Sequence, residues 1–111
     1  MKRQYQRESQ IQNEIMREFA TRPDMRLWRA NVLAARMHGR LVRAGVPGQA
    51  DLSGILADGR RLEIEVKSET GRLSEDQKRF GEMITRFGGV YIMARSVKDV
   101  RHCLAAYGVK L

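Results

Sequence analysis

The sequence has few features of a secreted or membrane protein. Cys103 is the only cysteine among 111 residues, which excludes an internal disulfide bond and a zinc site built from cysteines. No run of about 18 apolar residues occurs, so no transmembrane helix is expected. The basic amino terminus also lacks the apolar stretch of a secretory signal. These absences predict a cytoplasmic protein without a membrane partner.

Acidic residues are scarce relative to basic ones. Lys and Arg number 21 against 13 Asp and Glu, which gives a net charge of +8, and 16 of the basic residues are arginines. The planar guanidinium group suits two-point contact with phosphate better than a lysine ammonium group does. No segment places basic residues beside a strongly apolar stripe, as a membrane-surface helix does. Nucleic acid is therefore the expected polyanionic partner.

Hydrophobic periodicity predicts one α/β domain over residues 1–111. The expected elements are a helix over 4–20, a strand over 25–32, a loop over 38–50, strands over 51–57 and 61–68, a helix from 75 to 87, a strand over 89–94 and a helix over 96–107. Residues 33–37, which follow the first strand, favour helix formation, so the pattern does not fix where that strand ends. The order of helix, three strands, helix, strand and helix favours a mixed sheet flanked by helices. The helix over 75–87, which Ser74 and Gln77 begin with a capping box, should bury Phe80 and Phe87, and the strand that follows it should be buried on both faces.

The strand over 61–68 carries chemistry on one face. Alternation places Glu63, Glu65 and Lys67 opposite an apolar face, which by itself is typical of a solvated sheet surface. Asp51 lies on the strand before Glu65, and the hairpin between them can bring Asp51, Glu65 and Lys67 together. Two neighbouring carboxylates repel unless a cation lies between them, and hard oxygen ligands suit Mg²⁺ or Mn²⁺. Such a site would activate water for attack on a phosphoryl group, with Lys67 orienting the water or neutralising charge.

This chemistry requires a particular turn between the two strands. A two-residue turn at Asp58 and Gly59 would pair Asp51 with Val66 and put the acid on the wrong face. A three-residue loop over 57–59, with Gly59 at positive φ, instead brings Asp51 opposite Glu65. The sequence therefore predicts an odd-length turn.

Several short motifs are similar to those of one nuclease family. They are Gly48-Gln-Ala-Asp51-Leu, Leu62-Glu-Ile-Glu65-Val-Lys67, Gly71-Arg-Leu-Ser74-Glu-Asp-Gln77, Glu8-Ser-Gln-Ile-Gln12, Arg29-Ala-Asn31 and Gly88-Gly89-Val-Tyr. Together they resemble the VRR-NUC (virus-type replication-repair nuclease) domain of the PD-(D/E)XK superfamily, in the stand-alone form found in phages and prophages. Ala50 departs from the pattern, since it stands where the motif has proline.

The resemblance implies a restriction-endonuclease-like fold that hydrolyses DNA phosphodiesters with Mg²⁺ or Mn²⁺. It also implies a homodimer that acts on branched DNA such as Holliday junctions. Asp51 and Glu65 would be metal ligands together with the Val66 carbonyl, and Lys67 would be the motif lysine. A non-catalytic module that binds nucleic acid is the alternative function.

Other residues have two interpretations. Glu8 is either a solvated acid at the start of a helix or an acid associated with the metal, and Gln77 either closes the capping box or reaches the active site. Glu63 is expected near the edge of the sheet, and Trp28 is interpreted as a core or dimer-contact residue rather than as a base-stacking platform. A stretch without acids is expected to contact DNA, unless it is merely a solvated loop; its candidate residues are Arg29, Asn31, Arg36, Arg40 and Arg43.

Overall fold

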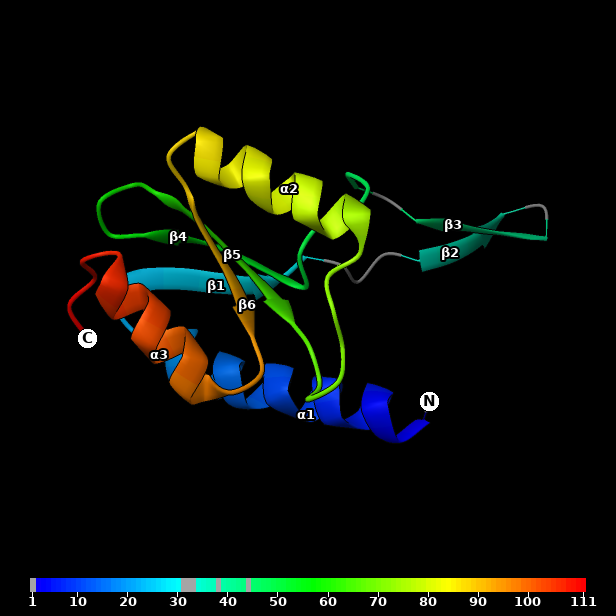
Figure 1. Ribbon diagram of the computed structural model, residues 1–111, viewed down its shortest axis with the longest axis horizontal. Coiled ribbons are helices and arrows are strands. Elements are labelled where there is room, and N and C mark those ends of the chain that lie inside the picture. The colour runs from blue at the N-terminus through cyan, green and yellow to red at the C-terminus, as the bar shows by residue number, and fades with distance from the viewer. Residues whose placement is uncertain (1, 31–33, 38, 44) are drawn as a thin grey trace.

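A four-stranded sheet forms the centre of the molecule (Figure 1). The computed structural model describes the backbone of residues 2–30, 34–37, 39–43 and 45–111, and the side chains of residues 7–30 and 45–111. Within these residues the chain forms α1 (Lys2–Phe19), β1 (Met25–Arg29), β2 (Ala34–Met37), β3 (Arg40–Arg43), β4 (Leu52–Leu56), β5 (Arg61–Val66), α2 (Glu75–Arg86), β6 (Val90–Ala94) and α3 (Val97–Ala106). The sheet has the order β1-β4-β5-β6, with β5 and β6 parallel and the other pairs antiparallel. The predicted α/β fold with a mixed sheet is confirmed.

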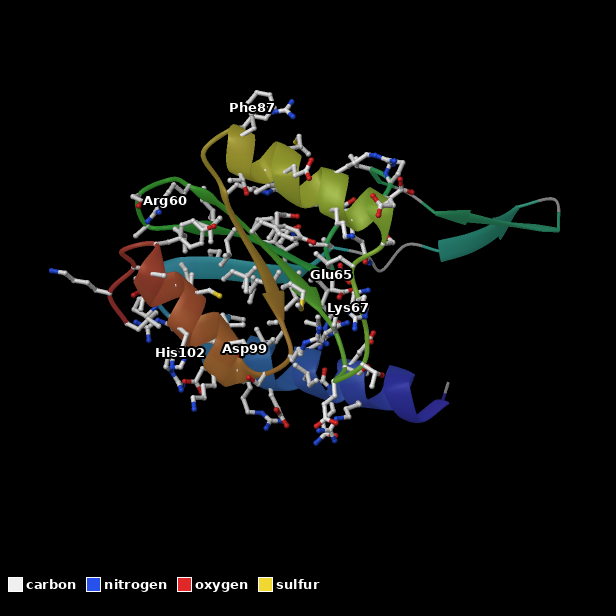
Figure 2. All side chains as sticks on the ribbon, viewed as in Figure 1. Arg60, Glu65, Lys67, Phe87, Asp99 and His102 are labelled. Carbon is white, nitrogen blue, oxygen red and sulfur yellow. The ribbon has the colours of Figure 1, made fainter. Side chains whose placement is uncertain are left out.

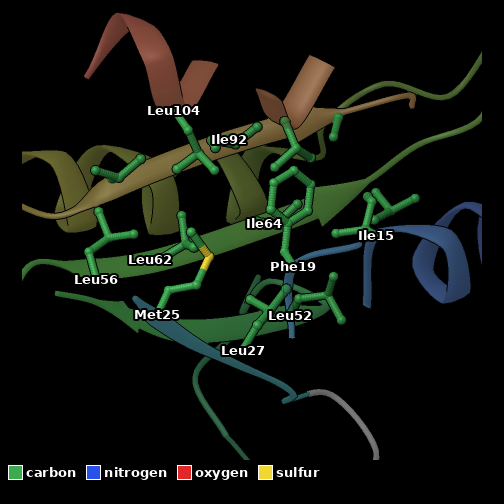
Figure 3. Packing of buried hydrophobic residues seen from close by; sticks show 14 of the residues in the cluster. Ile15, Phe19, Met25, Leu27, Leu52, Leu56, Leu62, Ile64, Ile92 and Leu104 are labelled. Carbon is green, nitrogen blue, oxygen red and sulfur yellow. The ribbon is translucent and has the colours of Figure 1, made fainter. Parts of the chain in front are cut away.

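One face of the sheet is apolar and packs against α1 and α3. Ile15 and Phe19 of α1 and Leu104 of α3 meet Ile64 and Ile92 at the centre of the core (Figure 3). These side chains are at most 1% exposed. Because α1 and α3 cover this face, any polar chemistry on the strands must lie on the other face, toward α2.

The helix α2 covers the second face over β5 and β6. Ser74 and Gln77 form the predicted capping box at its start. Phe80 packs edge to face against Tyr91 of β6, and Gly81 lies so close to the Tyr91 ring that a Cβ atom there would come within 2.7 Å of it. A glycine at this position therefore lets α2 lie close to the sheet.

Two expectations about this layer are wrong. Phe87 is 79% exposed rather than buried, because α2 ends at Arg86 and the chain turns away there toward β6. The strand β6 is buried on one face only, since it forms the edge of the sheet and its residues Tyr91 and Met93 are half-buried.

The loop predicted over residues 38–50 is also wrong in its first part. Strand β3 lies within this range and pairs antiparallel with β2, with Met37 facing Arg40. Gly39, directly before β3, has a φ of 77°. This second sheet projects from the body of the molecule in Figure 1. Each strand has only four residues without a clear apolar alternation, so periodicity did not reveal it.

The turn between β4 and β5 has the predicted odd length. The Leu56 N–H donates to the Arg60 carbonyl at 2.9 Å, and Gly59 adopts a φ of 92°. The ladder then pairs Leu52 with Ile64. Continuing it by one residue places Asp51 opposite Glu65, on the face covered by α2.

Candidate active site

Asp51 and Glu65 lie side by side on the face of the sheet that α2 covers. The two carboxyl groups are within hydrogen-bonding reach of each other. Asp51 Oδ2 also accepts a hydrogen bond of 2.9 Å from the Val66 N–H. The β4–β5 register thus brings together two of the predicted metal ligands, and it places the third, Val66, beside Asp51.

The surroundings of Glu65 favour its neutral form. Its side chain is buried near the amino-terminal end of α2 (Figure 2). Burial, together with the adjacent Asp51 carboxylate, raises the pKa of Glu65 to about 8. Lys67 opposes this shift, with its Nζ 3.6 Å from Glu65 Oε2. Burial likewise raises the pKa of Asp51, although the hydrogen bond from Val66 partly offsets the effect.

Gln77 closes the capping box and also contacts Glu65. Its side-chain oxygen accepts from the Ser74 N–H at 2.8 Å, which closes the capping box. Its Nε2 group donates to Glu65 Oε2 at 3.1 Å. One amide therefore fixes the start of α2 and at the same time orients an acid of the site.

The turn before β4 fixes the position of Asp51 relative to α2. Gly48 has a φ of 77°, and a Cβ atom there would lie 2.2 Å from the backbone oxygen of Asp76 in the first turn of α2. Only glycine allows this close approach. Ala50, which stands in place of the motif proline, is fully buried directly before Asp51.

Glu8 of α1 approaches the site from the opposite side. Its Oε2 atom accepts a hydrogen bond of 3.2 Å from the Ser68 N–H, directly after Lys67, and its charge acts on Asp51. Arg95 holds the same loop by donating to the carbonyls of Ser68 and Gly71. Glu8 is half-buried, and its charge acts on Asp51.

The predicted DNA-contacting residues are spread over two places. Arg29 pairs with Leu52, so it lies on the α1 face of the sheet and donates to Gln12 and Asn13 of that helix. Arg36, Arg40 and Arg43 belong to the projecting β2–β3 hairpin, of which the structure describes the backbone. Asn31 lies outside the described residues. Their contact with DNA stays a prediction.

Sequence reasoning missed a second polar group next to the site. Glu63 was expected near the sheet's edge, but it is fully buried on a central strand and accepts hydrogen bonds from Ser53 Oγ and Arg61 Nε, each 2.9 Å long. Trp28 is not a core residue, because it is 44% exposed, and the Arg61 guanidinium lies 6.0 Å from its ring centre. The alternation of β5 puts residues 61, 63 and 65 on one face, and this was the sequence signal that placed Arg61 and Glu63 on the same face as Glu65.

The donors at the site fit a hard divalent cation. The carboxyl groups of Asp51 and Glu65 share a buried position, and carboxylate oxygens are ligands of the kind that Mg²⁺ and Mn²⁺ prefer. Burial raises the pKa of both Asp51 and Glu65, and the charge of Lys67 opposes this shift. Over the residues whose side chains are described, no group of three or more His, Cys, Asp or Glu side chains already has the spacing of a complete metal site.

Comparison with known proteins gives one match. A family model described as the VRR-NUC domain matches residues 3–98, which include every residue of the site. The chain matches no curated protein and no solved structure at a significant level. None of the helices in the described part of the chain has the length and apolar character needed to cross a bilayer.

Proposed function

The chain belongs to the VRR-NUC family, whose domain implies a nuclease of the PD-(D/E)XK type, and we propose that it is an endonuclease that cleaves DNA with Mg²⁺ or Mn²⁺. The observation that carries the proposal is the pairing of Asp51 with Glu65 beside Lys67, at the end of β5 where α2 begins. Two carboxyl groups held together in a buried position cost stability, so a protein whose role was only to bind DNA would gain nothing from them.

In the proposed reaction each residue has a separate task. Asp51 and Glu65 would hold the cation together with the Val66 carbonyl, and Glu8 would add negative charge near Asp51. A bound divalent cation supplies polarisation of the phosphoryl oxygens and neutralisation of charge at this place. Gln77 keeps the Glu65 carboxylate oriented through its hydrogen bond of 3.1 Å.

Lys67 acts on the water and on the developing charge. Its side chain is 14% exposed and its ammonium group lies 3.6 Å from Glu65 Oε2, so this group is held beside the acid pair. From there it orients the attacking water and stabilises the negative charge that develops on the phosphate. Water attacks phosphorus and the bond from phosphorus to the leaving oxygen breaks, which leaves one phosphate end and one hydroxyl end.

The substrate that we propose is branched DNA, including four-way junctions. A homodimer would present two such sites for paired cuts on a two-fold branched substrate. We also propose that Arg29, Asn31, Arg36, Arg40 and Arg43 contribute to DNA binding, and that the protein acts in the cytoplasm of a bacterial host as a phage or prophage product. The net charge of +8 supports binding to a polyanion.

A cleavage assay with two variants tests the proposal. The wild type is incubated with linear, flapped and four-way DNA in Mg²⁺ or Mn²⁺, beside Glu65→Gln and the control Glu82→Gln, which removes an exposed acid on α2. We expect cleavage by the wild type and by Glu82→Gln, and a loss to less than about a tenth by Glu65→Gln with DNA binding retained. Intact binding with no cleavage by the wild type would instead support the non-catalytic module.

A further inference from the structure

Half of the polar face of the sheet is left open by α2. The helix packs on β5 and β6, whereas β1 and β4 carry exposed side chains on the same face. Trp28, Ser53, Glu63 and Tyr91 occupy paired positions across the four strands, so they form one row on this face. The next row toward the β4–β5 turn contains Arg26, Ile55 and Arg61, all three exposed. The open half therefore combines an aromatic ring with arginines.

Arg61 is held in place by a buried acid. Glu63 is fully buried, and it accepts one hydrogen bond from Ser53 Oγ and one from Arg61 Nε. Burying a carboxylate is costly unless it is paired and hydrogen-bonded. Its pairing here fixes the head of an arginine whose own side chain is 53% exposed.

Trp28 and Arg61 form a platform that faces outward. The Arg61 guanidinium lies 6.0 Å from the centre of the Trp28 ring, and Nε is the atom that Glu63 engages. Within the part of the chain whose side chains are described, no hydrogen bond engages the two terminal nitrogens of Arg61. An exposed ring next to a fixed cation with free donors is the arrangement that stacks a nucleobase and binds a phosphate.

A groove lies beside the platform, with Arg61 in its wall. It has a volume of about 650 Å³ and lies between α2 and the β4–β5 turn, with Arg60, Arg61, Phe80 and Met83 among its walls. Gln49, two residues before Asp51, is also part of its lining. Along β5 the distance from Arg61 to Glu65 is four residues, or about 13 Å. A strand of a few nucleotides spans this distance.

We propose that the Trp28–Arg61 platform binds an unpaired nucleotide of the DNA strand a few nucleotides away from the cut position. This inference rests on the proposed function and gives it a substrate class, DNA with a single-stranded segment at the site. Bases in a duplex already stack on each other, so only an unpaired base offers its face to Trp28. The surplus of arginine on this open half of the polar face favours a polyanion as its partner over a protein surface with few acidic residues.

The tryptophan itself reports on the platform, because Trp28 is the only tryptophan in the chain. Its fluorescence is recorded while an oligothymidylate or a blunt duplex of the same length is added in EDTA, so that no cleavage occurs. We expect quenching by the single strand and much weaker quenching by the duplex. Equal responses to the two DNAs, or no response, would overturn the proposal. A change that follows protein concentration instead of DNA would assign the platform to a second copy of the chain, and would equally overturn it.

Variants separate the platform from general charge. Binding of a labelled single strand is followed by anisotropy for Trp28→Ala, Trp28→Phe, Arg61→Gln and the control Arg101→Gln, which removes an exposed arginine on α3. We expect Trp28→Ala to weaken binding by about 5- to 150-fold, Trp28→Phe to restore most of it, and Arg61→Gln to weaken it more than the control does. Equal affinity of Trp28→Ala and the wild type, with circular dichroism showing both folded, contradicts the platform.

The fluorescence and binding measurements test the platform separately from cleavage. Normal cleavage of branched DNA without quenching of Trp28 would retain the nuclease and reject the platform. Quenching without any cleavage would retain the platform on a protein that only binds DNA.

Discussion

A carboxyl group that is buried beside another carboxyl group prefers to keep its proton, and Glu65 is in this position. Its pKa is raised to about 8 in the folded protein, well above the value of about 4.3 that an unfolded chain gives. The folded state therefore binds one more proton than the unfolded state between these two values. Because of this difference, Glu65 lowers the stability of the metal-free protein increasingly as pH rises from about 4.3 to about 8.

Replacing Glu65 by Gln should remove this pH-dependent cost. In EDTA, the melting temperature of Glu65→Gln is expected to exceed that of the wild type at pH 9, and the difference should shrink as pH falls toward 5. Thermal melts followed by circular dichroism at pH 5, 7 and 9 measure it, with the exposed Glu82→Gln as the control that shows no such trend. A gain that is the same at all three pH values would contradict the raised pKa.

At the scale of single elements, α2 connects fold and site through one side chain. Gln77 closes the capping box at Ser74 and also donates to Glu65, so stability and chemistry share a residue. Ser74 has only the first of these roles, because its side chain accepts from the Gln77 N–H. The two residues are therefore a matched pair for separating the roles.

Ser74→Ala and Gln77→Ala should lower stability to a similar extent but differ in cleavage. Each loses part of the cap, which costs about 1 kcal/mol. Only Gln77→Ala also loses the contact with Glu65, and we expect it to cleave DNA roughly 10- to 100-fold more slowly. Melts and cleavage rates of both variants give the comparison. Equal cleavage rates for the two would reduce Gln77 to a helix cap.

How far the sequence predicts the elements depends on local chemistry. The turn at Gly59 and the cap at Ser74 were predictable because a positive φ and a capping box each need particular residue types. The β2–β3 hairpin was not, since its four-residue strands lack a clear pattern. Burial of Glu63 could not be read from alternation alone, because the buried carboxylate depends on hydrogen bonds from Ser53 across the ladder and from Arg61.

For the whole molecule, the charge and shape indicate how DNA is approached. The chain carries a net charge of +8, and its dimensions are 46 × 30 × 25 Å, with the β2–β3 hairpin projecting at one end (Figure 1). Three of the arginines expected to contact DNA belong to that hairpin. The backbone of these three arginines therefore lies outside the sheet that holds the acids.

We expect the protein to form a homodimer. Two copies related by a two-fold axis match the two-fold symmetry of a four-way junction. Their two active sites would make paired cuts on it, one by each copy. Light scattering at micromolar concentration should give twice the chain mass of 12.7 kDa. Protein that is active on junctions and remains monomeric under the same conditions would contradict this expectation.

The central claim is that Asp51 and Glu65 together hold a divalent cation, and calorimetric titration with Mn²⁺ tests it most directly. At pH 7 the titration is run in two buffers with different heats of protonation, which counts the protons released. Because the pKa of Glu65 is about 8, we expect one binding event per chain with release of about one proton, and its loss in Glu65→Gln. Binding of Mn²⁺ to Glu65→Gln with unchanged affinity and unchanged proton release would show that the cation does not bind at this pair.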